Sequence, residues 1–231
     1  MIETADKFIS WGWKKKGKNI INNLPSMQLS NIKTGIKKEG DILMVLASYP
    51  RYYYSYYSVP ISEDYLFYLK NIEKIYKSIN LEKRLEIRIR FDKEIEGWEA
   101  EKRIRKNLPI IKKDNHKSLN DSLKNSKIVI CTANSTVFLE TLSANYPTLL
   151  FLDLSFYQLR EDVISEFSEL VNLKICHFQI ESLCSHLINI NQDIENWWGD
   201  IELQKIRKSF CNKYAKKSDY CVNEWAKFIK R

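Results

Sequence analysis

Short apolar runs alternate with amphipathic segments along the middle of the chain, and this alternation constrains the fold most strongly. The runs are β-rich and apolar nearly throughout, as in DILMVLA (residues 41–47) and KIVIC (residues 127–131). Strands that are apolar on both faces are typical of parallel sheets covered by helices on both sides. The sequence therefore predicts an α/β fold with a doubly wound, Rossmann-like parallel sheet and right-handed crossovers.

The expected elements follow one another without an internal repeat or a low-complexity linker. We expect an irregular segment or linker at 1–31, an α/β domain at 32–192 and C-terminal helices at 193–231 that pack on the same domain. Ser62 is the expected N-cap of the first long helix. The expected strands are 41–47, 85–91, 108–111, 127–131, 148–152 and 174–178, and the expected helices are 62–78, 99–106, 118–125, 137–144, 157–170 and 181–190.

Composition bounds the class of protein. No run of about eighteen apolar residues occurs, and the first thirteen residues contain Glu3 and Asp6 without an apolar core, so neither a membrane span nor a signal peptide is expected. The chain is expected in the cytoplasm. Its 37 basic and 29 acidic residues give a net charge of +8, which favours a polyanion such as nucleic acid, an anionic membrane face or a phosphate-bearing ligand. A solvated lysine-rich face explains the same charge, and no nucleic-acid-binding motif is present.

The cysteines and histidines show no familiar metal-binding pattern. Five cysteines without a CxxC pair are expected to be small buried apolar residues. Cys176, His177, Cys184 and His186 lie within eleven residues, but their spacing fits no zinc site, so no metal is expected. His116, in the polar run KKDNHKS, is expected at the surface.

The run TANST after the strand at 127–131 is the strongest candidate site. It places Asn134, Ser135 and Thr136 at the start of a helix, where backbone amides and the helix dipole attract an anion. Glu140 follows Thr136 by four residues and shares its face of the helix. Hydroxyls for a phosphate and a carboxylate for ribose hydroxyls would form a nucleotide clamp. The alternative is that the Ser-Thr pair only caps the helix and Glu140 is an exposed helical residue.

Arginines lie near two other expected strand ends. Arg51 lies among six tyrosines after the strand at 41–47, and alternation in LEIRIRF places Arg88 and Arg90 on one face of their strand. Arginine forks bind phosphate oxygens in pairs, so these side chains are candidate phosphate ligands. On that interpretation, replacing Arg90 would weaken binding and leave the stability of the free protein unchanged.

Several longer runs point to a family. NSKIVICTANSTVFLETLSANYPTLLFLD (residues 125–153) resembles the donor-site motif of GT-B glycosyltransferases: a strand, a Ser/Thr-rich turn, a helix with an internal Glu, and a strand after a proline. More narrowly, the chain resembles a family of transferases from bacterial surface-polysaccharide gene clusters. That resemblance rests on ADKFISWGW, LASYPRYYYSYYSVPIS, FYQLRE, ENWWGD and FCNKYAK, and covers nearly the whole chain.

The resemblance implies a GT-B C-terminal domain that binds a nucleotide-sugar donor for transfer to a glycan or lipid-linked acceptor, in the cytoplasm at the inner face of the membrane. It implies no metal, no cofactor beside the donor substrate and no specific nucleic-acid partner. Members of that family are longer, and this sequence corresponds to their second half. An acceptor-binding N-terminal half is therefore expected on a separate chain, and transfer is expected to need it. The implied donor-phosphate ligands are Arg51, Arg88, Arg90, Asn134, Ser135 and Thr136, and the implied ribose ligand is Glu140.

The alternative function is a non-catalytic module. Such an orphan or split half would bind nucleotide, or would pair with a separate N-terminal half, without transferring sugar itself.

Overall fold

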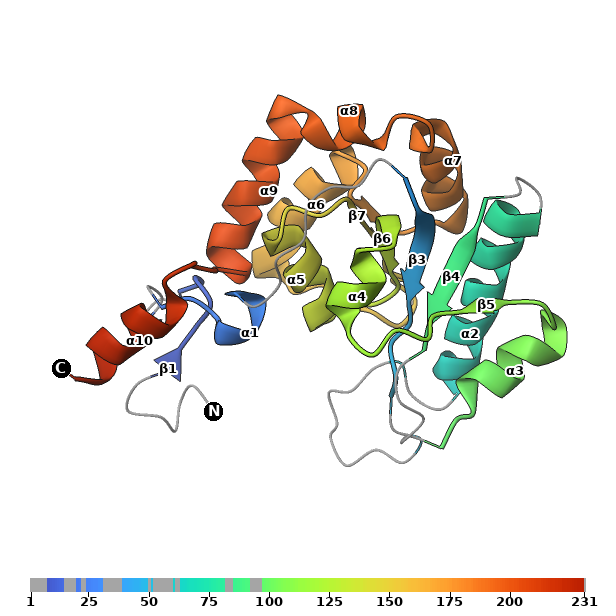
Figure 1. The fold of residues 1–231 in the computed structure, drawn as a ribbon, viewed down its shortest axis with the longest axis horizontal. Helices are drawn as coiled ribbons and strands as arrows, with labels where there is room; N and C mark the ends of the chain where they lie inside the picture. The colour runs from blue at the N-terminus through green and yellow to red at the C-terminus, as the bar shows by residue number, and fades with distance from the viewer. Residues whose placement is uncertain are drawn as a thin grey trace.

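A six-stranded, entirely parallel sheet forms the centre of the molecule, in the order β5-β4-β3-β6-β7-β8 (Figure 1). The computed structural model describes residues 8–14, 20–21, 24–30, 39–49, 51, 60, 63–81, 85–91 and 97–230. The sheet confirms the predicted doubly wound α/β fold. Its strands are β3 (Asp41–Val45), β4 (Ile87–Arg90), β5 (Lys112–Lys113), β6 (Ser126–Cys131), β7 (Thr148–Phe151) and β8 (Cys176–His177).

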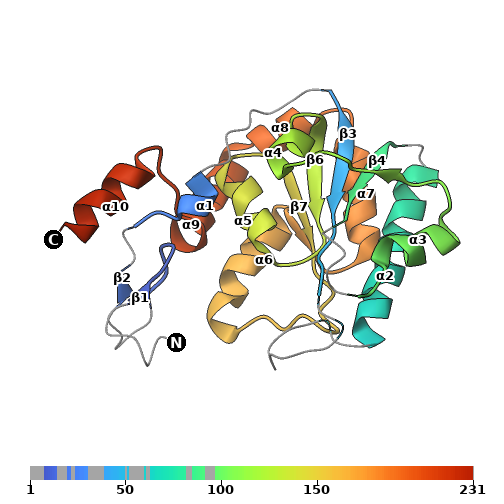
Figure 2. The same cartoon turned by 60° about the horizontal axis from the view of Figure 1, so that its bottom comes forward.

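Helices cover both faces of the sheet, as the apolar strands predict (Figure 2). One face carries α2 (Glu63–Tyr76), which continues as a π-helical turn (Lys77–Leu81), together with α3 (Ala100–Asn107) and α7 (Ile180–Ile190). The other face carries α4 (Leu119–Leu123), α5 (Thr136–Ser143) and α6 (Ile164–Asn172), the last preceded by a 3-10 turn (Glu161–Val163).

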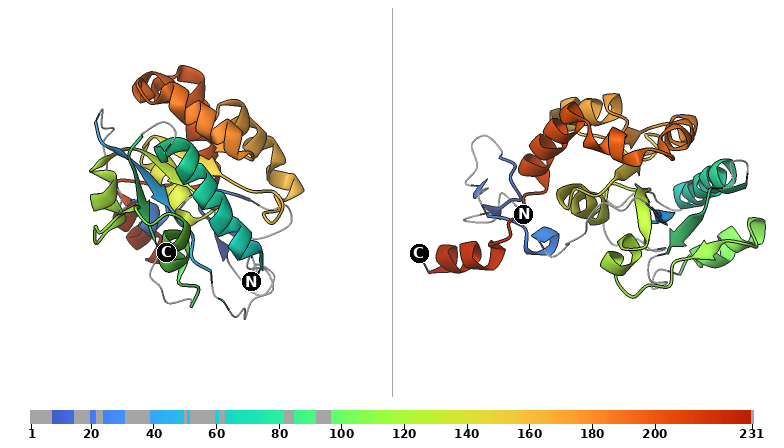
Figure 3. Two further views of the ribbon diagram at one scale, coloured as in Figure 1. Left: turned by 90° about the vertical axis from the view of Figure 1, so that its right-hand side faces the viewer. Right: turned by 45° about the horizontal axis from the view of Figure 1, so that its top comes forward.

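The remaining described elements lie at the two ends of the chain. β1 (Phe8–Ile9) pairs with β2 (Ile20–Ile21) in a separate two-stranded parallel sheet, and a single helical turn, α1 (Met27–Ser30), follows. After α7 come α8 (Ile194–Gly199), α9 (Ile201–Tyr214) and α10 (Cys221–Ile229). α9 packs on α5 and α6, whereas α10 extends from the body and contacts α1 (Figure 3).

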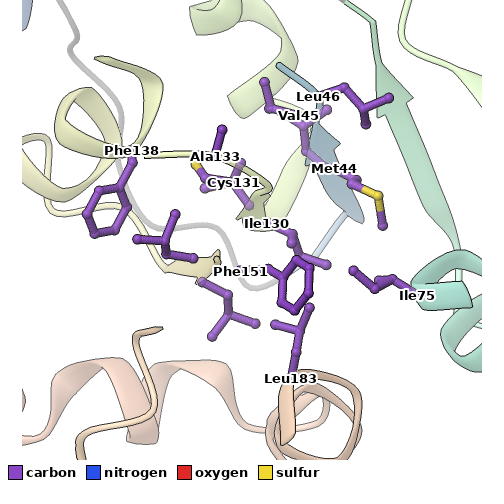
Figure 4. Close-up of a cluster of buried hydrophobic side chains, with 14 of the residues drawn as sticks. Met44, Val45, Leu46, Ile75, Ile130, Cys131, Ala133, Phe138, Phe151 and Leu183 are labelled. Carbon is purple, nitrogen blue, oxygen red and sulfur yellow. The ribbon is translucent and has the colours of Figure 1, made fainter. Parts of the chain in front are cut away.

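The core fills both sides of the central strands. Met44 and Ile130 are fully buried in neighbouring strands, and Phe138 of α5 and Leu183 of α7 bring side chains from the two helical layers (Figure 4). Burying a large apolar side chain stabilises a fold by roughly 1.5–3 kcal/mol. The sheet is therefore the rigid part of the molecule, and its strand ends are firmly positioned.

The structure corrects several predicted boundaries. The third strand was expected at 108–111, but β5 is Lys112–Lys113, because Pro109 has no amide hydrogen for a strand ladder. The helix expected at 157–170 starts only at the 3-10 turn and runs as α6 to Asn172. Ser62 lies outside the described residues.

Within the described residues, none of the helices combines the length and the apolar character that crossing a bilayer would need. All five cysteines are buried and free, as expected for small apolar residues.

Candidate functional site

The strand order reverses next to β3, which defines a topological switch point at the carboxyl ends of β3 and β6. The chain moves from β3 to β4 and β5 on one side and then returns to β6, β7 and β8 on the other. In doubly wound sheets, ligands bind outside the carboxyl ends of the strands at this switch point. Here the switch point lies between Leu46, which follows β3, and Thr132, which follows β6.

A buried hydrogen-bond chain joins the two strand ends at the switch point. Ala47 N–H donates to Tyr68 Oη at 2.9 Å, Tyr68 donates to Thr132 Oγ1 at 2.6 Å, and Thr132 donates to Val45 O at 2.8 Å. Burial raises the pKa of Tyr68 well above its ordinary value, so the phenol keeps its proton. These hydrogen bonds hold the ends of β3 and β6 and the helix α2 together at the switch point.

The start of α5 follows the end of β6 after four residues. Asn134 and Thr136 are exposed, and Ser135 is the N-cap residue with an extended backbone at φ −120° and ψ 174°. The Ser135 side chain makes no capping hydrogen bond to the helix. The Ser135 backbone amide donates to Ala133 O at 2.9 Å. Helix starts present several backbone amides without intrahelical partners. These amides, with two hydroxyls beside them, are the chemistry that an oxyanion requires.

Glu140 is buried one turn into α5, with only 8% of the residue exposed. Its Oε1 accepts a hydrogen bond from Gln28 Nε2 of α1 at 2.7 Å. Burial raises the pKa of Glu140 above its ordinary value, against the opposing effect of the Gln28 hydrogen bond. The alternative interpretation, in which Glu140 is an exposed helical residue, is therefore wrong.

Aromatic side chains line the same edge of the sheet beside β3. The ring of Tyr65, in the first turn of α2, lies 4.9 Å from that of Trp98 and 6.0 Å from that of Tyr49. The guanidinium carbon of Arg51, which is exposed, lies 5.7 Å from the centre of the Trp98 ring. Tyr49 Oη also hydrogen-bonds to Tyr157 Oη at 2.5 Å. The other five tyrosines of the predicted cluster, at positions 52, 53, 54, 56 and 57, lie outside the described residues.

Arg88 and Arg90 face α4, on the same side of β4, as the alternation predicts. Arg88 is buried, and its guanidinium lies 3.3 Å from both Asp41 Oδ1 and Asp114 Oδ1. Arg90 Nη1 contacts Asp114 Oδ2 at 2.6 Å and also donates to Ser122 Oγ at 3.0 Å. These partners are those of a structural ion-pair cluster, and they favour a loss of stability on substitution. The expected donor-phosphate role of the two arginines stays a prediction.

Asp114 is the centre of this cluster, which we call the Asp114 cluster (Asp41, Arg88, Arg90, Asp114, His116, Ser122 and Ser126). Burial alone would raise the pKa of Asp114, but hydrogen bonds from Ser122, His116 and Arg90 outweigh it and lower the pKa. His116 Nδ1 lies 2.6 Å from Asp114 Oδ1, and Asn125 Nδ2 lies 3.0 Å from His116 Nε2. The His116 side chain is 33% exposed, so it lies at the surface as expected, but both of its ring nitrogens have partners.

Two histidines lie together near β8, of which His177 is buried and His186 is half-buried. His177 Nε2–H donates to Lys174 O at 2.9 Å, and Ser182 Oγ lies 2.9 Å from the other ring nitrogen. The ring of His186 lies 5.5 Å from that of His177. Burial lowers the pKa of both histidines to about 4. Over the part of the chain that the structure describes, no three His, Cys, Asp or Glu side chains gather where they could hold a metal ion.

Comparison with protein families adds the missing classification. The family model described as "LIC12162 family transferase" matches residues 1–229, which is nearly the entire chain. The chain belongs to this family. It is therefore a member of a transferase family with a parallel, Rossmann-like α/β fold. A comparison with curated proteins finds no match.

Four residues of this edge and of the Asp114 cluster were not singled out by the sequence. Gln28 is 112 residues from its partner Glu140, and no local pattern connects them. The helical periodicity of α2 predicts Tyr68 as a core residue. It does not predict that the Tyr68 hydroxyl hydrogen-bonds to Thr132 at the switch point. Trp98 follows a predicted strand, and Asp114 follows a strand that was expected four residues earlier. Position after a strand was the one signal that could have found these last two residues.

Proposed function

We propose that this chain binds the nucleotide part of a nucleotide-sugar at the switch point between β3 and β6. The observation that carries the proposal is the start of α5, which has no side-chain cap and lies directly after β6. A diphosphate placed there would accept hydrogen bonds from backbone amides and from the hydroxyls of Ser135 and Thr136. Asn134, which is exposed, would donate from its side-chain amide.

Glu140 would accept hydrogen bonds from the ribose. It lies one turn below the phosphate position, and Gln28 fixes the orientation of its carboxyl group. A carboxyl that is already largely desolvated loses little further hydration when a sugar hydroxyl binds, which favours this partner over water.

Arg51 would supply the cation that balances the phosphates. Its side chain is exposed beside the Trp98 ring at the edge of the switch point. Arg88 and Arg90 would have to leave the buried carboxylate of Asp114 to reach a ligand. Such a movement would leave the buried carboxylate of Asp114 without its counter-charge, which costs free energy.

In this proposal the reaction is glycosyl transfer of the GT-B type, in the synthesis of a bacterial surface polysaccharide. Membership of a transferase family supports a group-transfer reaction, and the resemblance of residues 125–153 to GT-B donor sites supports a nucleotide-sugar as its donor. Helix-start amides and Arg51 would stabilise the departing nucleotide phosphate. The second candidate function, a non-catalytic module, would use the same nucleotide site.

A thermal-shift screen against UDP-, GDP-, CMP- and dTDP-sugars tests the proposal. One class of donor should raise the melting temperature in a concentration-dependent manner, because a ligand that binds only the native state stabilises it. The free nucleoside phosphate of that class should produce most of the same shift. A protein that no nucleotide or nucleotide-sugar stabilises would contradict the proposed function.

A further inference from the structure

The positive charge of the chain is concentrated at its two ends. Residues 1–38 contain eight basic and two acidic residues, and residues 201–231 contain nine and three. The stretch between them, 39–200, contains twenty basic and twenty-four acidic residues and is therefore net acidic. The net charge of +8 thus does not describe the α/β sheet domain, and it requires a separate explanation.

The described parts of the two ends lie together in space. Lys216 N–H donates to Trp11 O at 3.0 Å, and Ser26 N–H donates to Lys216 O at 2.9 Å. Trp225 Nε1–H donates to Pro25 O at 2.8 Å. We call this region, residues 8–14, 20–21, 24–30 and 215–230, the terminal module. Its α10 extends beyond the end of α9 (Figures 2 and 3), whereas its α1 contacts α5 of the sheet domain.

The outer face of α10 is apolar and exposed. Val222 and Ile229 are each 74% exposed, and Ala226 between them is exposed as well. Their spacing of four and three residues places them in one stripe along the helix. The adjacent side of the helix, with Cys221 and Trp225, packs on Pro25. Within the described residues, the contacts to Pro25 hold α10 in place, and the apolar stripe stays exposed.

Basic side chains border this stripe. Lys227 and Lys230 are exposed and follow Asn223 in a second row beside the apolar one. Lys217, in the turn before α10, is exposed too, and Tyr220, next to the helix start, is 72% exposed. An apolar stripe next to lysines, with an exposed aromatic ring at one end, is the pattern of a helix that lies in the interface of a bilayer.

We propose that the terminal module docks on an anionic membrane surface through the outer face of α10. Lysines near a membrane are attracted to anionic head groups, and the stripe of Val222, Ala226 and Ile229 would enter the boundary between head groups and acyl chains. A nucleic acid would pair with the lysines but would leave the apolar stripe in water. The outer face of α10 is independent of the proposed nucleotide site, because the one residue of the terminal module that the site uses is Gln28 of α1.

Vesicle flotation tests the docking. The protein should float with vesicles of phosphatidylcholine mixed with phosphatidylglycerol, and binding should fall with added salt and be weak on phosphatidylcholine alone. The double variant Val222→Asp/Ile229→Asp should lose about tenfold or more of its partitioning. The double variant Lys227→Glu/Lys230→Glu should lose a similar share on the anionic vesicles.

The control is Ile110→Asp, which changes another exposed isoleucine, 89% exposed, between α3 and β5. It should bind vesicles as the wild type does, and all variants should keep the melting temperature and the nucleotide shift of the wild type. Equal losses in Ile110→Asp and Val222→Asp/Ile229→Asp would overturn the proposal, as would equal binding to both kinds of vesicle. Self-association that depends on Val222 and Ile229, without vesicle binding, would overturn it in favour of a second copy of the chain.

Discussion

The Tyr68 hydroxyl donates a hydrogen bond to Thr132 Oγ1 at 2.6 Å, and this bond connects α2 to the end of β6, next to the point where the strand order reverses. Tyr68→Phe removes the acceptor of the Ala47 amide and the donor to Thr132. Because Tyr68 and Thr132 are buried, we expect the free energy of unfolding to fall by about 1–3 kcal/mol. Urea denaturation at neutral pH measures this difference. Thr132 keeps its own bond to Val45 O, so the strand ends should stay paired.

The control for Tyr68→Phe is Tyr220→Phe, because Tyr220 is 72% exposed. Its unfolding free energy should stay within about 0.5 kcal/mol of the wild type. Equal stability of Tyr68→Phe and the wild type would show that the hydroxyl does not hold the switch point.

The arginines should separate into two kinds by stability. Arg88→Met leaves Asp41 and Asp114 with less of their buried counter-charge, and we expect a loss of roughly 3–5 kcal/mol. Arg51→Gln changes an exposed side chain, and the unfolding free energy should change by less than about 0.5 kcal/mol. Chemical denaturation of the two variants side by side measures both. An Arg88 variant as stable as the wild type would reopen its role as a phosphate ligand.

The sequence predicts the fold better than the site for a physical reason. The run that forms β6 is apolar on both faces. Such a run is stable only as a strand covered by helices on both sides, so the pattern identifies the strand and its place in a parallel sheet. The start of α5 could be predicted too, because the strand, the turn and the helix are adjacent in the chain. β5 was placed too early, because two exposed lysines form the strand and the buried Leu108 and Ile111 do not.

Long-range partners could not be predicted. Alternation places Arg88 and Arg90 on one face of β4. The carboxylate that pairs with both belongs to Asp114, which directly follows the neighbouring strand β5. The partner of Glu140 comes from α1, 112 residues earlier. A single sequence contains no local signal for either contact, although these contacts decide whether a charged side chain is available to a ligand.

Glu140 should distinguish ribose from sugars without the neighbouring hydroxyls. In calorimetry the wild type should bind a ribonucleoside diphosphate about tenfold more tightly than its 2′,3′-dideoxy analogue, a difference of about 1.4 kcal/mol. Glu140→Gln should reduce this preference, because a neutral amide accepts hydrogen bonds less strongly than a carboxylate. An unchanged preference in the variant would remove Glu140 from the ribose site.

The same substitution has a predictable effect on the free protein. The pKa of Glu140 is raised in the native state, so its ionised form opposes folding above that pKa, and the contribution becomes more favourable as the pH falls. Glu140→Gln should therefore hold or raise the melting temperature at pH 7, since the amide carries no charge. A marked drop in the melting temperature at pH 7 would contradict this account.

His177 should make the protein acid-sensitive. Its pKa is lowered from 6.5 to about 4 by burial, so the neutral form stabilises the native state at full strength above pH 6.5. That stability is lost progressively as the pH falls from about 6.5 to about 4, by up to about 3 kcal/mol. His177→Gln keeps a donor toward Lys174 O but cannot ionise, so its unfolding free energy should vary less across this range. Denaturation at a series of pH values compares the slopes, and equal slopes would contradict the assignment.

The central claim is that the start of α5 binds the phosphates of a nucleotide, and the sharpest test places a carboxylate there. Ser135→Asp should cap the helix and keep or raise the melting temperature of the free protein, because aspartate is a strong N-cap residue. The same carboxylate should repel a bound phosphate. Gln179→Asp is the matched control, since Gln179 begins α7 and also makes no side-chain cap.

Calorimetric titration of the nucleoside diphosphate selected by the thermal-shift screen is the deciding measurement. Ser135→Asp should weaken binding about tenfold or more while the protein stays fully folded, and Gln179→Asp should bind as the wild type does. Wild-type affinity in Ser135→Asp would rule out a phosphate site at the start of α5, because a bound phosphate cannot tolerate a carboxylate at the N-cap.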